Sequence, residues 1–403
     1  MKTRAVFFIG GFDPKSPEAF FARMDREKNR FSKLWNVDIT RDPAHEVAAD
    51  ISSSSFKACP MDTPYDWNTQ TEFHFLSLDD VVLSEFARPN ASRLWRYLHT
   101  FWDYMLSGTA FKFIKHSWRF SIYFFYPATM FLLTLLLCAW LAVVIRQSSI
   151  EWSNSIAVFV FFTVFATVLK LGGKKYHILH LMDLWNFSRD FLHNDQSEIG
   201  PKLDRFAAQI RGTIAKGNHD EILLIGHSTG GALILDAAGR AFEQDPHFLD
   251  HDCDVTIMTI GSTALKIGLH PSAQWFRNRL NRLFTKTNVR WVEYQCLTDL
   301  INFHRTNPAH LMGLESAINQ PPKIHDIRIK HMIDAATYKR IKRNFFRVHY
   351  QFVYGNTQFH HYDFFAICFG PVALWHRAHK HHAYRASFLT SRAVQGPLPG
   401  IDA

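Results

Sequence analysis

The stretch EILLIGHSTGGALILDAAGRAF, residues 221–242, decides the fold class of this chain. Its first five residues are an apolar run that predicts a buried strand, and residues 231–242 are an Ala- and Leu-rich run that predicts a helix. Between them stands Gly-His-Ser-Thr-Gly, residues 226–230, which matches the pattern G-x-S-x-G. Only small residues two positions before and after Ser228 let the chain turn so sharply. The pattern therefore predicts an elbow that presents the serine hydroxyl at the carboxyl edge of a sheet, where the following helix N-terminus favours negative charge.

Strand and helix patterns alternate on both sides of this stretch. Apolar or alternating runs predict further strands at residues 4–9, 71–78, 254–260, 289–296 and 324–329. Residues 17–31 have helical composition, and residues 203–214 have helical periodicity. Strands that alternate with helices indicate an α/β fold, with a mostly parallel sheet covered by helices on both faces.

Two uncharged apolar segments interrupt this alternation. Residues 120–145 contain no formal charge and would form a helix about 39 Å long, against a hydrocarbon core of about 30 Å. Residues 152–169 are a second uncharged segment after a very short linker. The pair predicts a transmembrane hairpin. Lysines and arginines flank its outer ends, whereas the linker offers only Arg146, so the positive-inside rule places both termini and the soluble parts in the cytosol, at an inner or cytoplasmic membrane.

Composition limits the remaining classes of protein. The 403 residues suffice for two or three ordinary domains, or for one large domain with an insertion. With 47% hydrophobic and 20% charged residues the chain is not a disordered one, and its slightly negative mean hydropathy excludes a polytopic membrane protein. The formal net charge of +9 favours an anionic partner, either a phospholipid surface or nucleic acid. Five scattered cysteines without a C-x-x-C pair are typical of reduced thiols in the cytosol.

These patterns predict four segments. Residues 1–100 form the first part of the α/β domain, and residues 101–180 form the hairpin insertion, with spans at about 120–145 and 152–171. Residues 181–374 form the second part, which contains the elbow, and residues 375–403 form a basic, His-rich tail of low order.

Around the elbow, the sequence resembles the α/β-hydrolase family, specifically its lipase-like and esterase-like members. EILLIGHSTGG resembles the nucleophile strand and elbow, and TIMTIGST and VRWVEYQCLTDLINF resemble the two strands that follow. FFIGGF, residues 7–12, resembles the strand that ends in the oxyanion-hole loop, with Gly-Gly where the family usually has His-Gly. The customary first hairpin is missing. The resemblance covers most of the chain outside the hairpin and the tail, and it implies an α/β-hydrolase-type sheet interrupted by the hairpin.

The resemblance implies that Ser228 is the nucleophile of a catalytic triad. Backbone N–H groups of Thr229 and of Phe12 or Gly11 would stabilise the oxyanion. The remaining elbow residues are Gly226, His227 and Gly230, of which His227 is expected to point away from the reaction and pack.

The triad acid and base must follow the nucleophile in the chain. Asp299 comes two residues after a predicted strand, where the acid belongs, whereas Glu293 lies inside that strand and Asp254 lies at the wrong edge of the sheet. The histidines in a suitable position are His331, His349, His360 and His361. We favour His349, because its aromatic neighbours in NFFRVHYQF could hold the ring, and we keep His361 as the alternative base.

Other features have more than one interpretation. TYKRIKRNFFR, residues 337–347, puts five positive charges within eleven residues, which is either a solvated helix face or a patch for anionic lipid headgroups. HKHHAYR, residues 379–385, lacks cysteines or carboxylates at ligand spacing, so we expect no metal site. The sequence contains no P-loop and no G-x-G-x-x-G after a strand, so we expect no nucleotide cofactor, and no nucleic-acid-binding module is recognisable.

The sequence therefore predicts a membrane-anchored serine hydrolase that cleaves an ester or thioester, with a lipid or long-chain acyl substrate. Two alternatives stay open. The chain could be a non-catalytic membrane scaffold that retains the fold, or an acyltransferase that passes the acyl group from the same serine to an alcohol. Acyl-chain length, headgroup and oligomeric state have no signature in the sequence.

Overall fold

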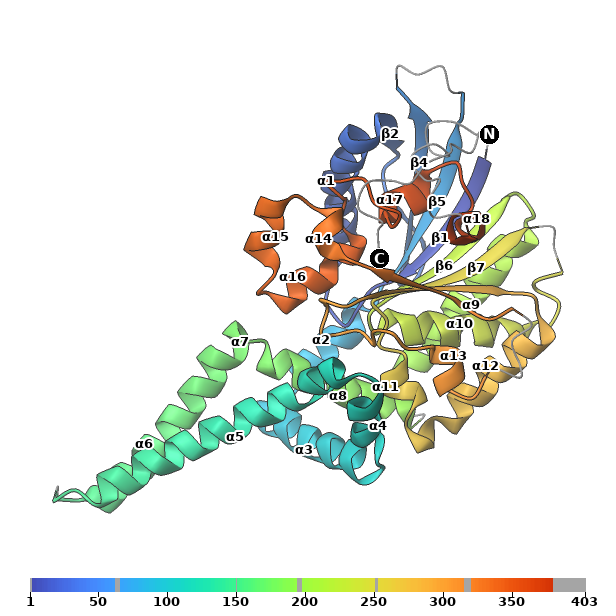
Figure 1. Cartoon of the computed structure of the whole chain (residues 1–403). Coiled ribbons are helices and arrows are strands. Elements are labelled where there is room, and N and C mark those ends of the chain that lie inside the picture. The colour runs from blue at the N-terminus through green and yellow to red at the C-terminus, as the bar shows by residue number, and fades with distance from the viewer. Residues whose placement is uncertain are drawn as a thin grey trace.

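A mixed β-sheet forms the centre of the computed structural model, which describes residues 2–61, 66–149, 151–193, 198–250, 253–314 and 320–379 (Figure 1). Within these residues the sheet has nine strands in the order β2-β4-β5-β1-β6-β7-β8-β9, and β3 pairs with β4. The strands are β1 (Lys2–Ile9), β2 (Val37–Arg41), β3 (His45–Ala48), β4 (Ile51–Pro60), β5 (Thr69–Leu76), β6 (Glu221–His227), β7 (Asp254–Ile260), β8 (Arg290–Cys296) and β9 (Lys323–Ile327). The six strands from β5 to β9 in this order run parallel, and β2, β3 and β4 form an antiparallel end.

Helices cover both faces of the sheet (Figure 1). On one side lie α1 (Pro17–Trp35), α14 (Ile329–Met332), α15 (Ala335–Ile341), α16 (Phe345–Tyr350), α17 (Phe364–Phe369) and α18 (Leu374–His379). On the other side lie α8 (Ile178–Leu192), α9 (Ile199–Ala215), α10 (Gly230–Gln244), α11 (Leu265–Gly268), α12 (Gln274–Lys286) and α13 (Pro308–Leu311). Short 3-10 segments occur at Pro271–Ala273 and Gln351–Val353.

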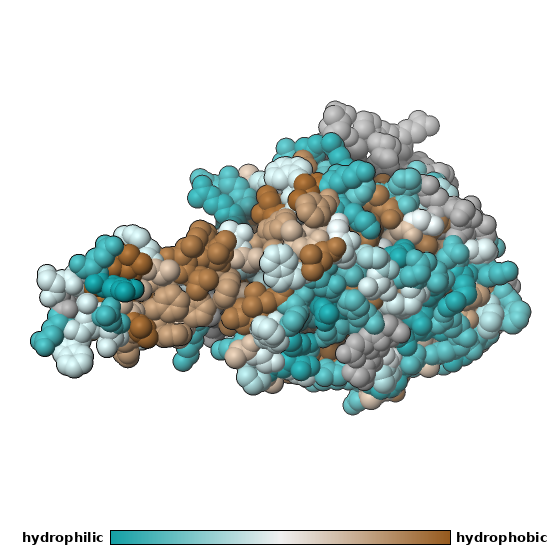
Figure 2. Space-filling view, turned by 90° about the horizontal axis from the view of Figure 1, so that it is seen from below, coloured by the Kyte–Doolittle hydropathy of each residue, from teal (hydrophilic) through white to brown (hydrophobic). Residues whose placement is uncertain are grey.

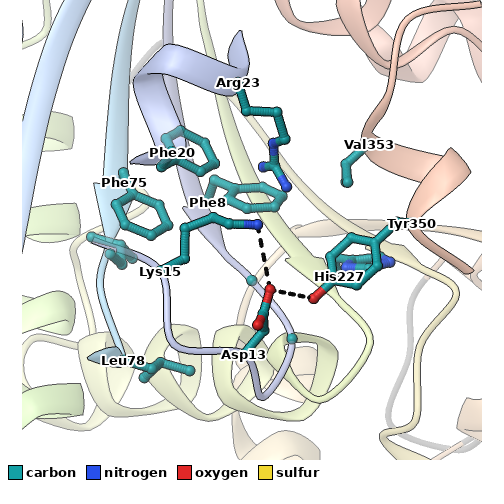
Figure 3. Close-up of a pocket in the computed structure, with 13 residues that line it drawn as sticks. Phe8, Asp13, Lys15, Phe20, Arg23, Phe75, Leu78, His227, Tyr350 and Val353 are labelled. Carbon is teal, nitrogen blue, oxygen red and sulfur yellow. Dashed lines mark hydrogen bonds and ion pairs between the residues drawn. The ribbon is translucent and has the colours of Figure 1, made fainter. Parts of the chain in front are cut away.

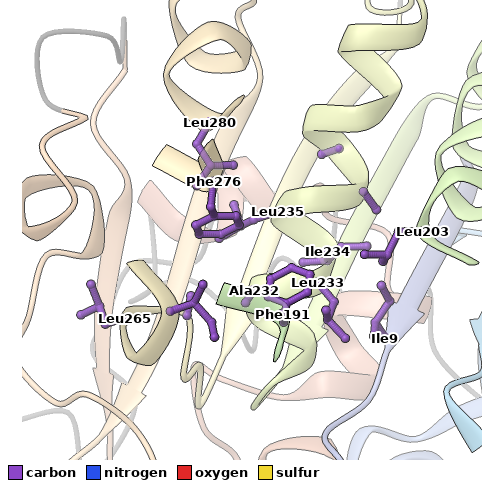
Figure 4. Packing of buried hydrophobic residues seen from close by; sticks show 14 of the residues in the cluster. Ile9, Phe191, Leu203, Ala232, Leu233, Ile234, Leu235, Leu265, Phe276 and Leu280 are labelled. Carbon is purple, nitrogen blue, oxygen red and sulfur yellow. The ribbon is translucent and has the colours of Figure 1, made fainter. Parts of the chain in front are cut away.

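Side chains of the central strands alternate between two buried clusters. In β1, Val6 and Phe8 pack toward α1 and α17, whereas Phe7 and Ile9 pack toward α9 and α10. Figure 4 shows the second cluster, in which Leu233 and its neighbours on α10 lie between the sheet and the flanking helices. Both faces of the parallel strands are therefore dry, which explains why these strands read as continuous apolar runs.

The carboxyl ends of β1 and β6 form a topological switch point. β1 continues through α1 to β2 on one side of the sheet, whereas β6 continues through α10 to β7 on the other side. In open α/β sheets, ligands bind in the crevice outside the carboxyl ends of two such neighbouring strands. Gly10 and Gly11 directly follow β1, and Ser228 directly follows β6, so the predicted elbow lies at this point.

Between β5 and β6 the chain leaves the α/β body. It passes through α2 (Asp79–Ala87), α3 (Asn90–Leu106) and α4 (Thr109–His116) into two long helices, α5 (Trp118–Arg146) and α6 (Ser153–Thr167). α6 continues as a π-helical turn, Val168–Gly172, and a short α7 (Gly173–Lys175) leads back to α8.

The helices α5 and α6 pair as a hairpin that projects from the body (Figure 1). α5 and α6, the latter together with its π-helical turn, are long and apolar enough to cross a membrane, and only 6% of the apolar stretch of each is buried. Figure 2 shows a hydrophobic band along the hairpin and a hydrophilic tip. A buried core helix would have the opposite exposure, so the hairpin is not part of the protein core.

The predicted strands and the helix that follows the elbow are present within two residues of their expected bounds, and the predicted spans correspond to α5 and to α6 with its π-helical turn. The other two predicted helices are longer than expected, since α1 ends four residues later and α9 begins four residues earlier. Two other expectations differ from the structure. The strands β2, β3 and β4 were not predicted, because β4 reads ISSSSFKACP and shows neither an apolar run nor alternation. The predicted tail begins too early, since α18 packs Arg377 and Ala378 against the body; residues 380–403 lie outside the described residues.

Candidate active site

Ser228 stands in a strained turn between β6 and α10. Its φ is +58°, a left-handed conformation that a serine adopts only when its surroundings enforce it. The Ser228 N–H donates to the carbonyl of Ile260 at 3.1 Å, and its own carbonyl accepts from the N–H groups of Gly231 and Thr263 at 3.0 and 3.1 Å. These bonds fix the turn to the end of β7 and to the first turn of α10.

The two elbow glycines are required by close backbone contacts. A Cβ at Gly226 would lie 2.4 Å from the carbonyl oxygen of Gly230, and a Cβ at Gly230 would lie 2.2 Å from the carbonyl oxygen of Ile9. Backbone atoms cannot move aside as a flexible side chain can. The small residues of the pattern are thus needed for the turn itself and for its contact with β1.

The structure brings Asp299 and His349 together. The Nδ1 atom of His349 lies 2.7 Å from Oδ2 of Asp299, although the two residues are 50 positions apart. Both side chains are buried. Because a carboxylate only accepts hydrogen bonds, Nδ1 carries the proton and Nε2 carries the lone pair. Nε2 is buried and has no hydrogen-bond partner among the described residues.

The turn after β8 holds Asp299 in one orientation. Its Oδ1 accepts from the N–H of Ile301 at 2.9 Å, which leaves Oδ2 for His349. Asn302 closes the turn, since its amide group donates to the carbonyls of Cys296 and Asp299 and its oxygen accepts from the Cys296 N–H. These hydrogen bonds therefore hold the Asp299 carboxylate in the orientation that faces His349.

His349 is placed next to the elbow by the residue that precedes Ser228. The ring of His227 packs on the ring of His349, with centroids 4.6 Å apart and an interplanar angle of 32°. The Nε2–H of His227 donates to the His349 carbonyl at 3.2 Å. Burial is the main cause that lowers the pKa of His227 well below its usual value, so His227 is neutral. His227 therefore packs, as predicted, and it packs against the favoured base.

The other candidate residues lie elsewhere. His360 is buried and accepts from the Tyr362 N–H, and burial lowers its pKa to about 4. The ring of the alternative base, His361, packs against His360, and His331 lies on α14. Glu293 faces Thr259 within the sheet, where burial raises its pKa to about 8, and Asp254 pairs with Arg290 at the start of β7. Among the candidate bases, His349 is the one that the described contacts join to Asp299.

Three backbone N–H groups border Ser228 as free donors. Those of Gly11, Phe12 and Thr229 make no hydrogen bond to any described residue. A Cβ at Gly11 would lie 3.5 Å from Ser228 Oγ, so the turn after β1 is directly adjacent to the serine. Free N–H groups on two sides of a serine are the arrangement that an oxyanion hole needs.

A buried lysine next to the elbow has no signal in the sequence pattern. Lys266, on α11, is fully buried, and its Nζ donates to Oγ1 of Thr229 at 3.0 Å. The ammonium also lies 5.7 Å from the ring centre of Trp185. Burial lowers the pKa of Lys266 to about 7. Because LKIG reads as an ordinary helical turn, only the tertiary structure shows that this charge lies behind the elbow.

The start of α5, at the body end of the hairpin, contacts two segments of the candidate site: the turn that carries Asp299 and helix α16, which carries His349. The guanidinium of Arg119 donates to the Leu297 carbonyl in the turn that carries Asp299, and the rings of Phe120 and Phe303 stack with centroids 4.0 Å apart. Tyr126 of α5 contacts helix α16, which carries His349: the rings of Tyr126 and Phe345 meet edge to face, with centroids 6.0 Å apart.

Helix α8, which follows the hairpin, extends these contacts. His180 and Phe187 pack on Phe12 of the turn after β1, and His177 packs on Phe346 of α16. The hairpin and α8 thus contact three parts of the candidate site: the turn that carries Asp299 (the acid turn), helix α16 with His349 (the base helix) and the turn after β1 with Gly10 and Gly11 (the glycine turn).

One group of side chains has the spacing of a metal site. Asp103, His193 and His270 offer ligand atoms within 4.8 Å of one another. However, Nδ1 of His270 accepts from the Ser272 N–H, so its proton is on Nε2, the atom that faces Asp103. Arg189 also donates to the Asp103 carboxylate. These contacts fit a hydrogen-bonded ion-pair cluster and leave no lone pair on His270 for a cation.

Comparison of the chain with protein-family models, with curated proteins and with solved structures finds no match.

Proposed function

We propose that this chain is a membrane-attached serine hydrolase of the α/β-hydrolase type, which cleaves an ester or thioester through an acyl-enzyme on Ser228. One juxtaposition supports the proposal above all. A serine at left-handed φ lies at the switch point of the sheet, and next to it the His349–Asp299 hydrogen bond engages Nδ1, while Nε2 has no hydrogen-bond partner among the described residues. Resting hydrolase sites often have a long serine–histidine contact that tightens when substrate binds.

The chemistry follows from this arrangement. Ser228 Oγ attacks the substrate carbonyl while His349 Nε2 takes the hydroxyl proton, and Asp299 stabilises the imidazolium that forms. The N–H groups beside the serine donate hydrogen bonds to the developing oxyanion. The tetrahedral intermediate then expels the alcohol or thiol, which takes the proton from Nε2. Water, activated by the same nitrogen, attacks the acyl-enzyme and releases the carboxylic acid.

The membrane attachment rests on the exposed hairpin and on the surface beside its base. The large apolar side chains exposed on α3, α4 and the start of α5 are Trp95, Trp102, Leu106, Phe111, Ile114 and Trp118. Those on α3 recur at helical spacing and form one face. Tryptophans at the edge of a membrane span are typical of the lipid–water interface. We infer that α3 and α4 lie against the headgroups and that the α/β body faces the cytosol.

The contacts of the hairpin base support a lipid or long-chain acyl substrate. The segments that touch the acid turn, the base helix and the glycine turn are the same ones that enter and leave the membrane. Ser228 and His349 are 5% and 3% exposed, so an acyl chain reaches them only when this layer moves. A bilayer that holds the hairpin would also present acyl chains at this side of the protein.

Turnover of acyl esters by the purified full chain in detergent tests the proposal. Long-chain p-nitrophenyl esters and acyl thioesters should be hydrolysed by the wild type and by Ser262→Ala, and not by Ser228→Ala. Ser262 is a matched control because it is also buried and lies two residues after the neighbouring strand β7. A folded wild type that turns over no ester or thioester would favour the non-catalytic scaffold. Products with a competing alcohol separate hydrolysis from acyl transfer.

The membrane topology has its own test. Reporter fusions at residue 148, in the linker of the hairpin, and at the C-terminus should report opposite sides of the membrane. Reporters on the same side would contradict the two-span arrangement.

A further inference from the structure

A pocket lies behind the turn after β1, which contains Gly10 and Gly11 (Figure 3). It has about 400 Å³ of space free of protein atoms, part of it open to solvent, between α1, the end of β5 and the segment after α16. Gly11 and His227 line it, and both are direct neighbours of Ser228. A group bound in this pocket would therefore be separated from the nucleophile by the width of one glycine.

Arg23 points into this pocket without a polar partner (Figure 3). The residue is only 5% exposed and makes no hydrogen bond or ion pair with the described residues; its Nε is buried and unpaired. The rings of Phe20 and Tyr354 lie 5.0 and 5.8 Å from the guanidinium carbon. Aromatic rings stabilise the charge, but they do not satisfy the in-plane N–H groups, which are suited to two oxygens of one anion.

Carboxylates near Arg23 are already engaged. Glu27, one turn along α1, pairs with Arg30 at 2.8 Å and accepts from the Gly355 N–H at 3.0 Å. Asp13, on the pocket wall, accepts from Lys15 Nζ at 3.3 Å and from the Tyr350 hydroxyl at 2.6 Å. Among the described residues no carboxylate is therefore left to pair with the Arg23 guanidinium, and an anionic ligand would supply that partner.

The pocket carries one net positive charge. Its titratable groups are Asp13, Lys15, Arg23, His227 and Tyr350. His227 is neutral, and burial raises the pKa of Tyr350 well above its usual value, so this hydroxyl stays protonated. Asp13 balances Lys15, and Arg23 remains. Burial, followed by the charge of Arg23, lowers the pKa of Lys15, as expected for two cations that repel each other around an empty space.

We propose that this pocket binds a singly charged oxyanion group of the substrate, the phosphodiester of a membrane glycerophospholipid, through Arg23 and Lys15. A phosphodiester brings one negative charge, which neutralises the pocket, and two oxygens that match the guanidinium fork. The ester carbonyl of the same lipid then lies at Ser228, on the other side of Gly11. This inference rests on the proposed function and assigns its substrate class.

The test compares matched esters on the full chain in detergent micelles. The substrates are a short-chain phosphatidylglycerol, the diacylglycerol with the same chains, and the same ester with a carboxylate in place of the phosphodiester. The variants are Arg23→Met, Arg23→Lys and Lys15→Met. Arg26→Met is the control, because Arg26 lies on the same helix with its guanidinium exposed.

The wild type should prefer the phosphodiester ester to the neutral one. Arg23→Met should reduce kcat/KM for that ester about ten- to a hundredfold, as expected for lost hydrogen bonds to a charged group, mainly through KM. For the neutral ester, Arg23→Met should change kcat/KM by less than about twofold. For the phosphodiester ester, Arg23→Lys should recover part of the kcat/KM that Arg23→Met loses, and Lys15→Met should lose less than Arg23→Met. Arg26→Met should match the wild type on both esters. If the carboxylate ester shows the same dependence and the phosphodiester ester does not, the phospholipid assignment is overturned.

Two outcomes would overturn the inference while leaving the proposed function intact. One is equal loss on charged and neutral esters in Arg23→Met, which would show a structural role for the arginine. The other is a wild type without preference for the anionic ester. In both cases Ser228 would still react with a fluorophosphonate probe. Absence of that reaction in the folded wild type would instead defeat the proposed function.

Discussion

Replacing Asp299 by Asn should abolish activity by reversing one hydrogen bond. In the wild type, Oδ1 accepts from the Ile301 N–H at 2.9 Å and Oδ2 accepts from His349 Nδ1–H at 2.7 Å. An asparagine must keep its oxygen toward the Ile301 N–H, so its NH2 group faces His349. The ring can then make a hydrogen bond only with an unprotonated Nδ1, which puts the proton on Nε2. A protonated neutral Nε2 cannot take the proton of Ser228.

The expected size of this effect follows from the wrong tautomer. In serine hydrolases, the same change to the triad acid lowers kcat by about 10⁴-fold. Stability should change much less, because a neutral hydrogen bond replaces a charged one, a difference of about 1 kcal/mol. Ester turnover and thermal unfolding, measured on the same preparation, separate the two effects.

The matched control is Asp326→Asn. Asp326 also lies 2.7 Å from a histidine nitrogen, that of His304, but it is not part of the candidate site. This variant should retain full activity. Asp299→Asn with activity within tenfold of the wild type would refute the assigned roles of the pair.

Three further predictions concern the surroundings of the site. Burial lowers the pKa of Lys266 to about 7, so between pH 7 and about 10.4 the unfolded chain binds more protons than the folded protein. The free energy of unfolding should therefore rise with pH by up to about 1.4 kcal/mol per pH unit in this range. Urea unfolding of Lys266→Met should lack this slope. A slope that persists in the variant would show that Lys266 is not its source. Gly230→Ala should lower the free energy of unfolding by about 1–3 kcal/mol and abolish turnover, because the new Cβ would meet a backbone oxygen of β1. The control is Gly212→Ala, where the Cβ has open space; it should leave stability unchanged or raise it in the same assays. Equal effects of the two substitutions would contradict the backbone-contact argument. Phe120→Ala should lower stability by about 3–5 kcal/mol and reduce kcat, because it removes the ring that stacks on Phe303 beside the turn with Asp299. The control is Leu136→Ala, at an exposed position of the same helix. An unchanged kcat in a folded Phe120→Ala would contradict a role of the hairpin in supporting the site.

The sequence predicted those parts of the fold that depend on local pattern. The strand, the elbow and the helix of residues 221–242 carry their own signals, because a dry parallel strand must be apolar and a tight turn needs small residues. The two apolar helices of the hairpin were also predicted, because their length and lack of charge are visible in the sequence alone. Asp299 was selected as the candidate acid by its distance from a strand end, and the structure places it next to His349.

What the sequence did not predict depends on distant contacts. The serine run of β4 forms a strand because it pairs with β5 on one side and with β3 on the other, and this backbone pairing carries no side-chain signature. Lys266 and Arg23 appear in the sequence as ordinary basic residues on helices. Their meaning comes from burial beside the elbow and the pocket, which only the assembled fold defines.

The histidine lies between these two cases. Four histidines had a suitable place in the chain order, and aromatic neighbours favoured His349 without excluding the others. The hydrogen bond to Asp299 distinguishes it, because that bond joins segments 50 residues apart. Local sequence contains no information about which loop folds back onto the acid turn.

The most direct test of the central claim maps the residue that reacts with a fluorophosphonate probe. The full chain in native-like membranes is labelled, digested, and analysed by mass spectrometry. The account predicts one adduct, on the peptide that contains Ser228, and a labelling rate that collapses in His349→Ala. An adduct on another residue, an unchanged rate in that variant, or no adduct on the folded protein would contradict it.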